Sequence, residues 1–176
     1  MYKDIPGFIV SRLNQRVGNE AAWIVYNGEA SIVEVDAAAM HLLGFPMGVF
    51  SLGDFVGLDV GVLAAKALVE RGFSTHPSPL GREKFEKGEL GVKSGKGYYV
   101  YPTPGKYVKP KLPKKLASKV NPVRIVAPAV NEAAWLIRNG VASKEDVDKS
   151  AKLCMGIPTG LLEMADEYGI DRIVEI

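Results

Sequence analysis

Residues 19–23 read Asn-Glu-Ala-Ala-Trp, and the same five residues return without a gap at positions 131–135. The likeness continues at this offset of 112 positions, and 18 of the 41 positions from Asn19 to Asp59 match their partners. Unrelated segments agree at roughly one position in sixteen, so the likeness indicates a duplicated structural unit. Two such units are expected to pack as a pair about an approximate twofold axis, as the subunits of a homodimer do.

The composition is that of an ordinary globular protein. Its 176 residues are 47% hydrophobic and 24% charged, enough to bury a real core. The net charge of +2 is too small to indicate a nucleic-acid partner. No apolar run reaches the roughly 20 residues that cross a bilayer, and no signal peptide is recognisable, so we expect a cytoplasmic protein without a membrane partner. The single cysteine, Cys154, excludes an internal disulfide, and its apolar neighbours predict a buried thiol.

Apolar residues at helical spacing, interrupted by glycine and proline, predict a nearly all-helical chain. Ser31 and Glu34 match a capping box, in which each side chain bonds the backbone amide of the other residue. Pro122 suits the opening turn of a helix, and Ser143 is placed like Ser31. In the first unit, helices are expected over residues 8–27, 31–43, 49–56, 59–71 and 80–87. In the second unit, one helix is expected from Pro122 to a stop at Gly140, another begins after Ser143, and a third covers residues 161–168.

The two units have unequal lengths. We expect a first domain over residues 1–101, a linker over residues 102–119 and a second, truncated copy over residues 120–176. Tyrosines at residues 98–101 predict a small extended piece packed on helices. The linker is rich in proline and lysine, which is typical of a solvated extended segment, and an anion-binding patch is the alternative. Its basic residues are Lys106, Lys109, Lys111, Lys114, Lys115 and Lys119.

Few residues show a pattern of catalytic or metal-binding chemistry. His41 lies in a helical segment, where packing is the alternative to catalysis, and His76 lies in a loop without a neighbouring metal ligand. Residues 95–97, Gly-Lys-Gly, lack the strand and helix that flank a dinucleotide-binding loop. Carboxylates recur at matching turns of both units, and helix capping is favoured over acid–base chemistry for them. These residues are Asp54, Asp59, Asp166 and Asp171.

At residues 6–13 the sequence Pro-Gly-Phe-Ile-Val-Ser-Arg-Leu resembles the Pro-Gly-Phe-Ile-Val-Asn-Arg-Leu that opens the C-terminal domain of 3-hydroxyacyl-CoA dehydrogenases. Segments at residues 31–36, 44–59 and 91–99 resemble the same family in order and spacing. The resemblance covers residues 5–101 as a full domain and 120–176 as a partial one. It implies an all-α fold of the type found in the C-terminal domain of 6-phosphogluconate dehydrogenase, present as two tandem copies packed as a pseudo-twofold pair.

The resemblance also implies a function. Enzymes of this family oxidise 3-hydroxyacyl-CoA to 3-oxoacyl-CoA in fatty acid β-oxidation, with NAD and a catalytic His–Glu pair in a separate N-terminal domain. This chain is then expected to supply one wall of the acyl-CoA cleft and an association surface, either as an internal pseudo-dimer or as a homodimer. An NAD-binding domain would join it in cis or in trans. The isolated chain is expected to bind neither NAD nor a metal, and to be inactive.

Four positions acquire site roles through this resemblance. Ser11 stands where the family has the Asn that orders the catalytic groups and the reactive end of the substrate, although a hydroxyl reaches less far than an amide and has one donor. Val123, its partner in the second unit, cannot form that hydrogen bond. Pro46, Met47 and Leu52 are expected near the acyl chain.

Other functions remain open from the sequence. One is a non-catalytic helical module for protein association, and another is a related dehydrogenase that acts on small hydroxy acids. The start at Met1, just before the opening turn, and the end at Ile176 within a repeat indicate part of a longer polypeptide or a subunit with a separate partner. Equivalent packing of the two units predicts equivalent surroundings for Trp23 and Trp135.

Overall fold

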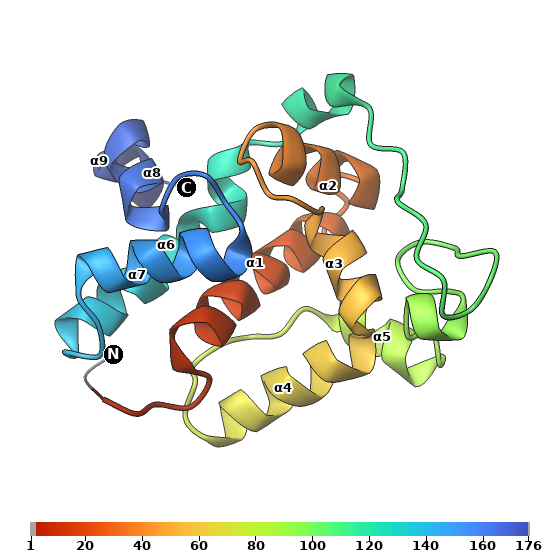
Figure 1. Ribbon diagram of the computed structural model, residues 1–176, viewed down its shortest axis with the longest axis horizontal. Coiled ribbons are helices and arrows are strands. Elements are labelled where there is room, and N and C mark those ends of the chain that lie inside the picture. Colours follow the sequence, from red (N-terminus) through yellow and green to blue (C-terminus); the bar gives the residue numbers. More distant parts are fainter. Residues whose placement is uncertain (1–2, 176) are drawn as a thin grey trace.

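A computed structural model describes residues 3–175, and helices carry almost all of its regular structure (Figure 1). The first repeat contains α1 (Phe8–Tyr26), α2 (Ile32–His41), α3 (Val49–Val56), α4 (Leu58–Glu70), α5 (Pro79–Glu86) and the short 3-10 helix η1 (Val92–Ser94). A second 3-10 helix, η2 (Lys114–Lys119), precedes the second repeat. That repeat contains α6 (Pro122–Arg138), α7 (Lys144–Ser150), the π-helical turn η3 (Ala151–Met155), α8 (Leu161–Tyr168) and α9 (Ile170–Val174).

The first helices of the two repeats, α1 and α6, pack against each other at the centre of the molecule (Figure 1). Each presents one apolar face, and the repeated Asn-Glu-Ala-Ala-Trp motif lies on this pair of helices. Burial of these faces removes apolar surface from water, which is the main force that holds the repeats together. The buried partners, each 112 positions apart, are Leu13 with Ile125, Val17 with Ala129, Ala21 with Ala133, and Ile24 with Leu136.

Reciprocal contacts confirm the pseudo-twofold packing. Arg12 of the first repeat binds Glu132 of the second at 2.6 Å, and Arg124 of the second binds Glu20 of the first at 3.0 Å. Both members of each pair are related by the same offset of 112 positions. When residue i contacts residue j and the partner of j contacts the partner of i, the interface is isologous. The tandem copies therefore pack as the two subunits of a twofold dimer would.

Each repeat also holds its third helix in the same way. The Asp36 carboxylate accepts hydrogen bonds from the first-turn amides of α3, Phe50 at 2.8 Å and Ser51 at 3.0 Å. In the second repeat the Asp148 carboxylate does the same for α8, accepting from the amides of residues 162 and 163 at 2.8 and 3.2 Å. These are helix N-caps supplied from 14 residues upstream, at positions whose orphan amides need acceptors.

Glycine is required beside each of these carboxylates. A Cβ placed on Gly48 would overlap the Asp36 carboxyl group, and one placed on Gly160 would overlap that of Asp148. The two glycines are again partners in the duplication. The glycine-containing breaks before α3 and α8 are therefore the places where a carboxylate accepts hydrogen bonds from the first turn of the following helix.

The expected helices are confirmed, with ends that differ by one or two residues. The capping box of Ser31 and Glu34 is present, and Pro122 lies in the first turn of α6 behind an N-cap at Asn121. Ser143 caps α7 by accepting from the Asp146 amide at 3.1 Å. These signals are local, so the sequence alone could reveal them.

Three expectations differ from the structure. Residues 98–101 are not the expected extended piece: they bend around Asp54 beside isolated bridges. Residues 102–105 form a turn and residues 106–113 have no regular structure, but residues 114–119 form η2 and pack on α2, with Ala117 buried. The tryptophans lie in different surroundings. Trp23 donates to the His76 carbonyl of a loop present only in the first repeat, whereas Trp135 lies under the Arg12 guanidinium.

Candidate functional site

An exposed apolar surface covers the outer side of α3. The helix turns Phe50, Ser51 and Asp54 into the protein, so Leu52, Phe55 and Val56 face outward. Leu52, Phe55 and Val56 are between 40 and 56% exposed, and the exposed apolar positions continue into α4 at Val60 and Leu63. Contiguous apolar exposure of this kind, unlike single exposed residues, marks a surface that binds something.

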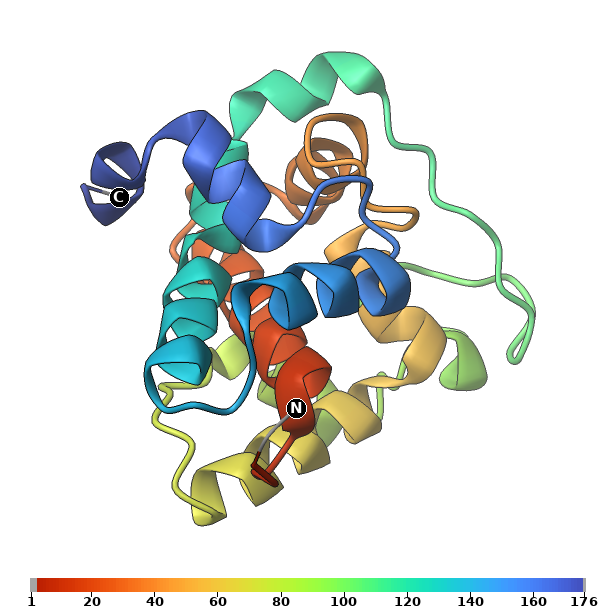
Figure 2. The ribbon, with the colours of Figure 1, turned by 60° about the vertical axis from the view of Figure 1, so that its left-hand side comes forward.

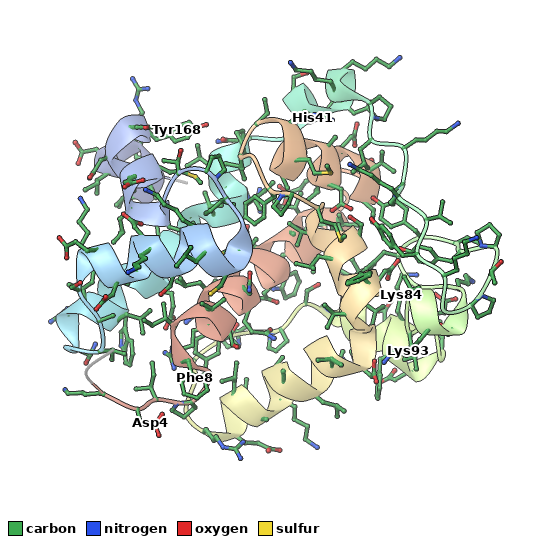
Figure 3. The ribbon with its side chains drawn as sticks, in the orientation of Figure 1. Asp4, Phe8, His41, Lys84, Lys93 and Tyr168 are labelled. Atoms are coloured by element: carbon green, nitrogen blue, oxygen red, sulfur yellow. The ribbon has the colours of Figure 1, made fainter. Side chains whose placement is uncertain are left out.

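The first turn of α1 is strained. Phe8 has a φ of 49°, the only positive φ at a non-glycine position among the described residues, and its side chain is 60% exposed. Figure 3 labels Phe8 at the end of α1 that lies beside α4. An aromatic residue in the left-handed region costs free energy, and such residues cluster at functional sites. Gly7 before it fits tightly, since a Cβ there would meet the side chains of Leu68 and Arg12.

The four residues expected at the site lie on two elements. Ser11 is exposed on α1, one turn after Phe8, and Leu52 is exposed on α3, which packs on α1. Met47 is half-buried at the start of α3. Pro46 is exposed but lies at the boundary between repeats, because a Cβ on Gly156 would be 3.0 Å from its ring.

Ser11 and the residue at the equivalent position of the second repeat differ in exposure and in chemistry. Val123, the equivalent residue on α6, is buried, whereas Ser11 is accessible. A hydroxyl that faces solvent can donate and accept with a ligand, whereas the Val123 side chain can do neither. Only the first repeat presents a hydrogen-bonding group at this position.

Beneath α3 lies a cluster of carboxylates and tyrosines. Asp54 accepts hydrogen bonds from the amides of Tyr98 and Tyr99 at 2.9 and 2.8 Å and from the Tyr101 hydroxyl at 3.0 Å. The Tyr99 hydroxyl donates to Asp36 at 2.9 Å. Burial raises the pKa of both carboxyl groups above the ordinary value, while the hydrogen bonds that they accept oppose this rise. The cluster anchors the turn at residues 97–101 to α3.

The expectation of helix capping is wrong for Asp54 and Asp166, whereas Asp59 and Asp171 lie in the first turns of α4 and α9. Asp54 holds a loop rather than a helix end, because its glycine-rich partner segment wraps around it. Asp59 forms an ion pair with Lys93, and Asp166 forms one with Lys144. Asp36 and Asp148 cap the next helices, α3 and α8, from 14 residues upstream. They recur in both repeats, as the other four aspartates do, and no local sequence pattern marks a carboxylate that caps a helix so far along the chain.

His41 ends α2, His76 lies in the loop before α5, and Cys154 lies in η3. The His41 Nε2 lies 2.9 Å from the Leu112 carbonyl, and the His76 carbonyl accepts from Asn19 and Trp23. Cys154 is exposed, contrary to expectation, because η3 turns it away from the core. Across residues 3–175, no three His, Cys, Asp or Glu side chains gather to hold a metal ion. Over the same residues, none of the helices combines the length and apolar character needed to span a bilayer.

These features define an internally duplicated all-α domain with an exposed apolar surface on α3 and α4. The family model described as 3-hydroxyacyl-CoA dehydrogenase, C-terminal domain, matches residues 7–101 and 122–176. The chain belongs to this family. The two matched segments coincide with the two repeats seen in the structure.

Similar proteins agree with this family. The chain is 33% identical to the fatty acid oxidation complex subunit alpha of Vibrio cholerae over 191 residues, which cover 99% of the chain and 26% of that protein. It is 38% identical to a probable 3-hydroxyacyl-CoA dehydrogenase of Caenorhabditis elegans over 106 residues, 56% of the chain and 33% of that protein. The chain thus spans about a quarter to a third of these curated relatives.

Two solved structures share the fold. The 3-hydroxybutyryl-CoA dehydrogenase of Escherichia coli aligns with a TM-score of 0.81 and 22% identity over 96% of this chain and 54% of that one. The (S)-3-hydroxybutyryl-CoA dehydrogenase of Ralstonia eutropha aligns with a TM-score of 0.56 and 34% identity over 58% of this chain and 37% of that one. The first alignment covers nearly the whole duplicated chain, and the second covers just over half of it.

Proposed function

We propose that this chain forms the acyl-binding wall and the association part of an NAD-dependent 3-hydroxyacyl-CoA dehydrogenase. The observation that carries this proposal is the exposed apolar surface of Leu52, Phe55 and Val56 on α3, a helix that packs on α1. An acyl chain needs an apolar surface without charge, and its 3-hydroxyl needs a polar group nearby. Ser11 on α1 supplies such a group.

In this proposal the polar and the apolar residues contact different parts of the substrate. The Ser11 hydroxyl contacts the 3-oxygen of the substrate and fixes its orientation, while Met47, Leu52 and Pro46 contact the acyl chain. NAD and the group that takes the hydroxyl proton are supplied by a nucleotide-binding domain, joined in cis or in trans. Family membership and the fatty acid oxidation relative support this assignment.

Binding of 3-hydroxydecanoyl-CoA to the chain tests the proposal. We expect measurable affinity by calorimetry, and Leu52→Asp should weaken it about tenfold because a charge replaces a buried apolar contact. Val174→Asp is the matched control: this valine is also exposed, on α9, remote from α3 in both ribbon views (Figures 1 and 2), and its replacement should leave the affinity unchanged. With NAD added, the chain alone should form no NADH, measured at 340 nm.

Two outcomes would contradict the proposal. Equal affinity for free CoA and for the acylated thioester would show that the apolar surface does not contact the chain. Turnover by the isolated chain would show that it contains the nucleotide site. If no thioester binds, the exposed α3 surface is better explained by the alternative function, a protein-association module.

A further inference from the structure

In the first repeat, two carboxylates hold the bend at residues 97–101 against α2 and α3. Asp54 on α3 accepts hydrogen bonds from the amides of Tyr98 and Tyr99 at 2.9 and 2.8 Å. Asp36 on α2 accepts from the Tyr99 hydroxyl at 2.9 Å, in addition to the two amides of α3. Both carboxylates are fully buried, so the bend shields them from water and supplies donors to them.

The second repeat places two carboxylates at the same points of its own helices. Asp148 accepts from the first-turn amides of α8, as Asp36 does for α3, and a Cβ on Gly160 would overlap it. Asp166 lies in the second turn of α8, as Asp54 does in α3. Hydrogen bonds and positions on the helices, and not sequence offset alone, therefore make the two pairs of carboxylates equivalent.

No bend covers the second pair of carboxylates within residues 3–175. Among these residues, no hydroxyl donates to Asp148, which accepts from the two α8 amides. The Asp166 side chain is 54% exposed and forms an exposed ion pair with Lys144. In Figure 1 the bend lies in the green loop to the right of α3, whereas α7 and α8 lie on the left of the molecule.

A cavity of about 640 Å³ lies in this place, between α7, η3 and the start of α8. Asp148 lines this cavity and is only 5% exposed, so a buried carboxylate with remaining acceptor capacity contributes to its wall. Lys144 and Lys152, also in the lining, form ion pairs with carboxylates of α8. Exposed ion pairs of this kind contribute little to stability, so a ligand displaces them at small cost.

We propose that this cavity is a docking groove for a tyrosine-bearing segment of a partner polypeptide, which binds the second repeat as residues 97–101 bind the first. The tyrosine hydroxyl donates to Asp148, and two successive backbone amides donate to Asp166. Hydrogen bonds to a charged acceptor stabilise a complex more than the exposed ion pair of Asp166 with Lys144 that they replace.

The first repeat also indicates the chemistry of the occupant. It is a polypeptide, because the equivalent carboxylate, Asp54, binds consecutive backbone amides. Glycine precedes the aromatic residues, because a Cβ on Gly97 would overlap the Asp54 carboxyl group. This inference concerns α7 and α8 and does not rest on the proposed function, which concerns α1 and α3.

A peptide with the sequence of residues 91–101, labelled with fluorescein at its N-terminus, is the probe. Fluorescence anisotropy should show saturable binding of one peptide per chain with a Kd below about 1 mM. A Tyr99→Phe peptide lacks the hydroxyl that reaches Asp148 and should bind about tenfold more weakly. A Tyr98→Phe peptide is the matched control and should bind as the parent does, because Tyr98 bonds its carboxylate through the amide.

Two variants of the chain locate the bound peptide. Asp166→Ala removes the acceptor of the peptide amides from an exposed position, so the fold is retained, and it should weaken binding about tenfold. Glu167→Ala is the matched control: this glutamate is exposed at the next position of α8, and its replacement should leave the affinity unchanged. Circular dichroism of both variants checks that the helices are intact.

Four outcomes would refute the inference. The first is the absence of saturable binding, and the second is equal affinity for the parent and the Tyr99→Phe peptides. The third is an equal loss of binding in Asp166→Ala and Glu167→Ala, which would show a general attraction to the charge of α8. The fourth is a dimer of the peptide-free chain that Asp166→Ala abolishes, because residues 97–101 of a second copy would then fill the groove. None of these results changes the expected binding of 3-hydroxydecanoyl-CoA, which tests the proposed function separately.

Discussion

Arg12 shows how equivalent residues diverge in a duplicated protein. Its guanidinium is buried between the rings of Phe73 and Trp135, at 4.5 and 4.6 Å from their centroids, and it binds Glu132. Its partner Arg124 forms the same interhelical pair with Glu20 at a more exposed position, and a further ion pair with Glu29. The Glu132 side chain is 3% exposed and that of Glu20 is 21% exposed, so water screens the two pairs to different degrees.

Replacement of these two glutamates should therefore lower the free energy of unfolding by unequal amounts. Glu132→Gln leaves the buried Arg12 and the half-buried Arg16 without their counter-charge, and we expect the free energy of unfolding to fall by about 3 kcal/mol. Glu20→Gln is the matched control and should cost less than about 1 kcal/mol. Urea unfolding followed by circular dichroism measures both values. Equal losses would show that burial does not distinguish the two ion pairs.

At the scale of elements, the ends of the helices could be predicted from the sequence, but the side chains that fix the helices and turns to one another could not. Capping residues lie within a few positions of the helices they start, so Ser31, Pro122 and Ser143 could be interpreted locally. Asp36 caps a helix 14 residues further along, and Asp54 holds a turn 44 residues away. The tyrosines near residue 100 suggested a small extended piece because their side chains favour extended backbone, but hydrogen bonds to the buried carboxylates hold them in a bend.

An ion-pair cluster attaches α5 to the glycine-rich loop that follows it. Glu89 accepts from Lys84 at 2.8 Å and pairs with Lys96 at 2.6 Å, and these two lysines lower the pKa of Glu89 to about 2. Figure 3 labels Lys84 on this side of the molecule. Because the folded-state pKa lies below the ordinary value of 4.5, the stabilisation is complete above pH 4.5 and is lost as the pH falls toward 2.

A Glu89→Gln variant should show this pH dependence. Its melting temperature should lie below that of the parent at pH 7, and the difference should shrink between pH 5 and pH 3. Glu86→Gln, which removes an exposed pair with Arg82 at 3.8 Å, should behave like the parent throughout. Thermal unfolding by circular dichroism at low salt provides the comparison. A difference for Glu89→Gln that stays constant with pH would refute the ionic explanation.

At the scale of the molecule, each repeat covers the apolar central face of the other. The α1–α6 contact buries the apolar residues that would otherwise lie on a subunit surface, and the reciprocal arginine–glutamate pairs flank it. Figure 2 shows the extended linker running around the outside of the molecule to join the repeats. A tandem chain of this kind holds both halves of a dimer at high effective concentration.

We therefore expect the chain to be monomeric in solution. Multi-angle light scattering should give the mass of one chain, 19.0 kDa, at micromolar concentration. The physical reason is that the twofold interface is already occupied within the chain. A stable 38 kDa species, which is twice the chain mass, would show that another surface, such as the exposed side of α3 and α4, mediates association.

The sequence by itself determined the duplication, the helices and the family, because identical residues at a constant offset, apolar periodicity and capping residues are all local or linear patterns. Only the tertiary structure decided how the repeats pair and which carboxylates cap helices. Those features depend on contacts such as that of Arg12 with Glu132, between residues 120 positions apart. The free energies of these contacts depend on burial and geometry, which cannot be deduced from the order of the residues.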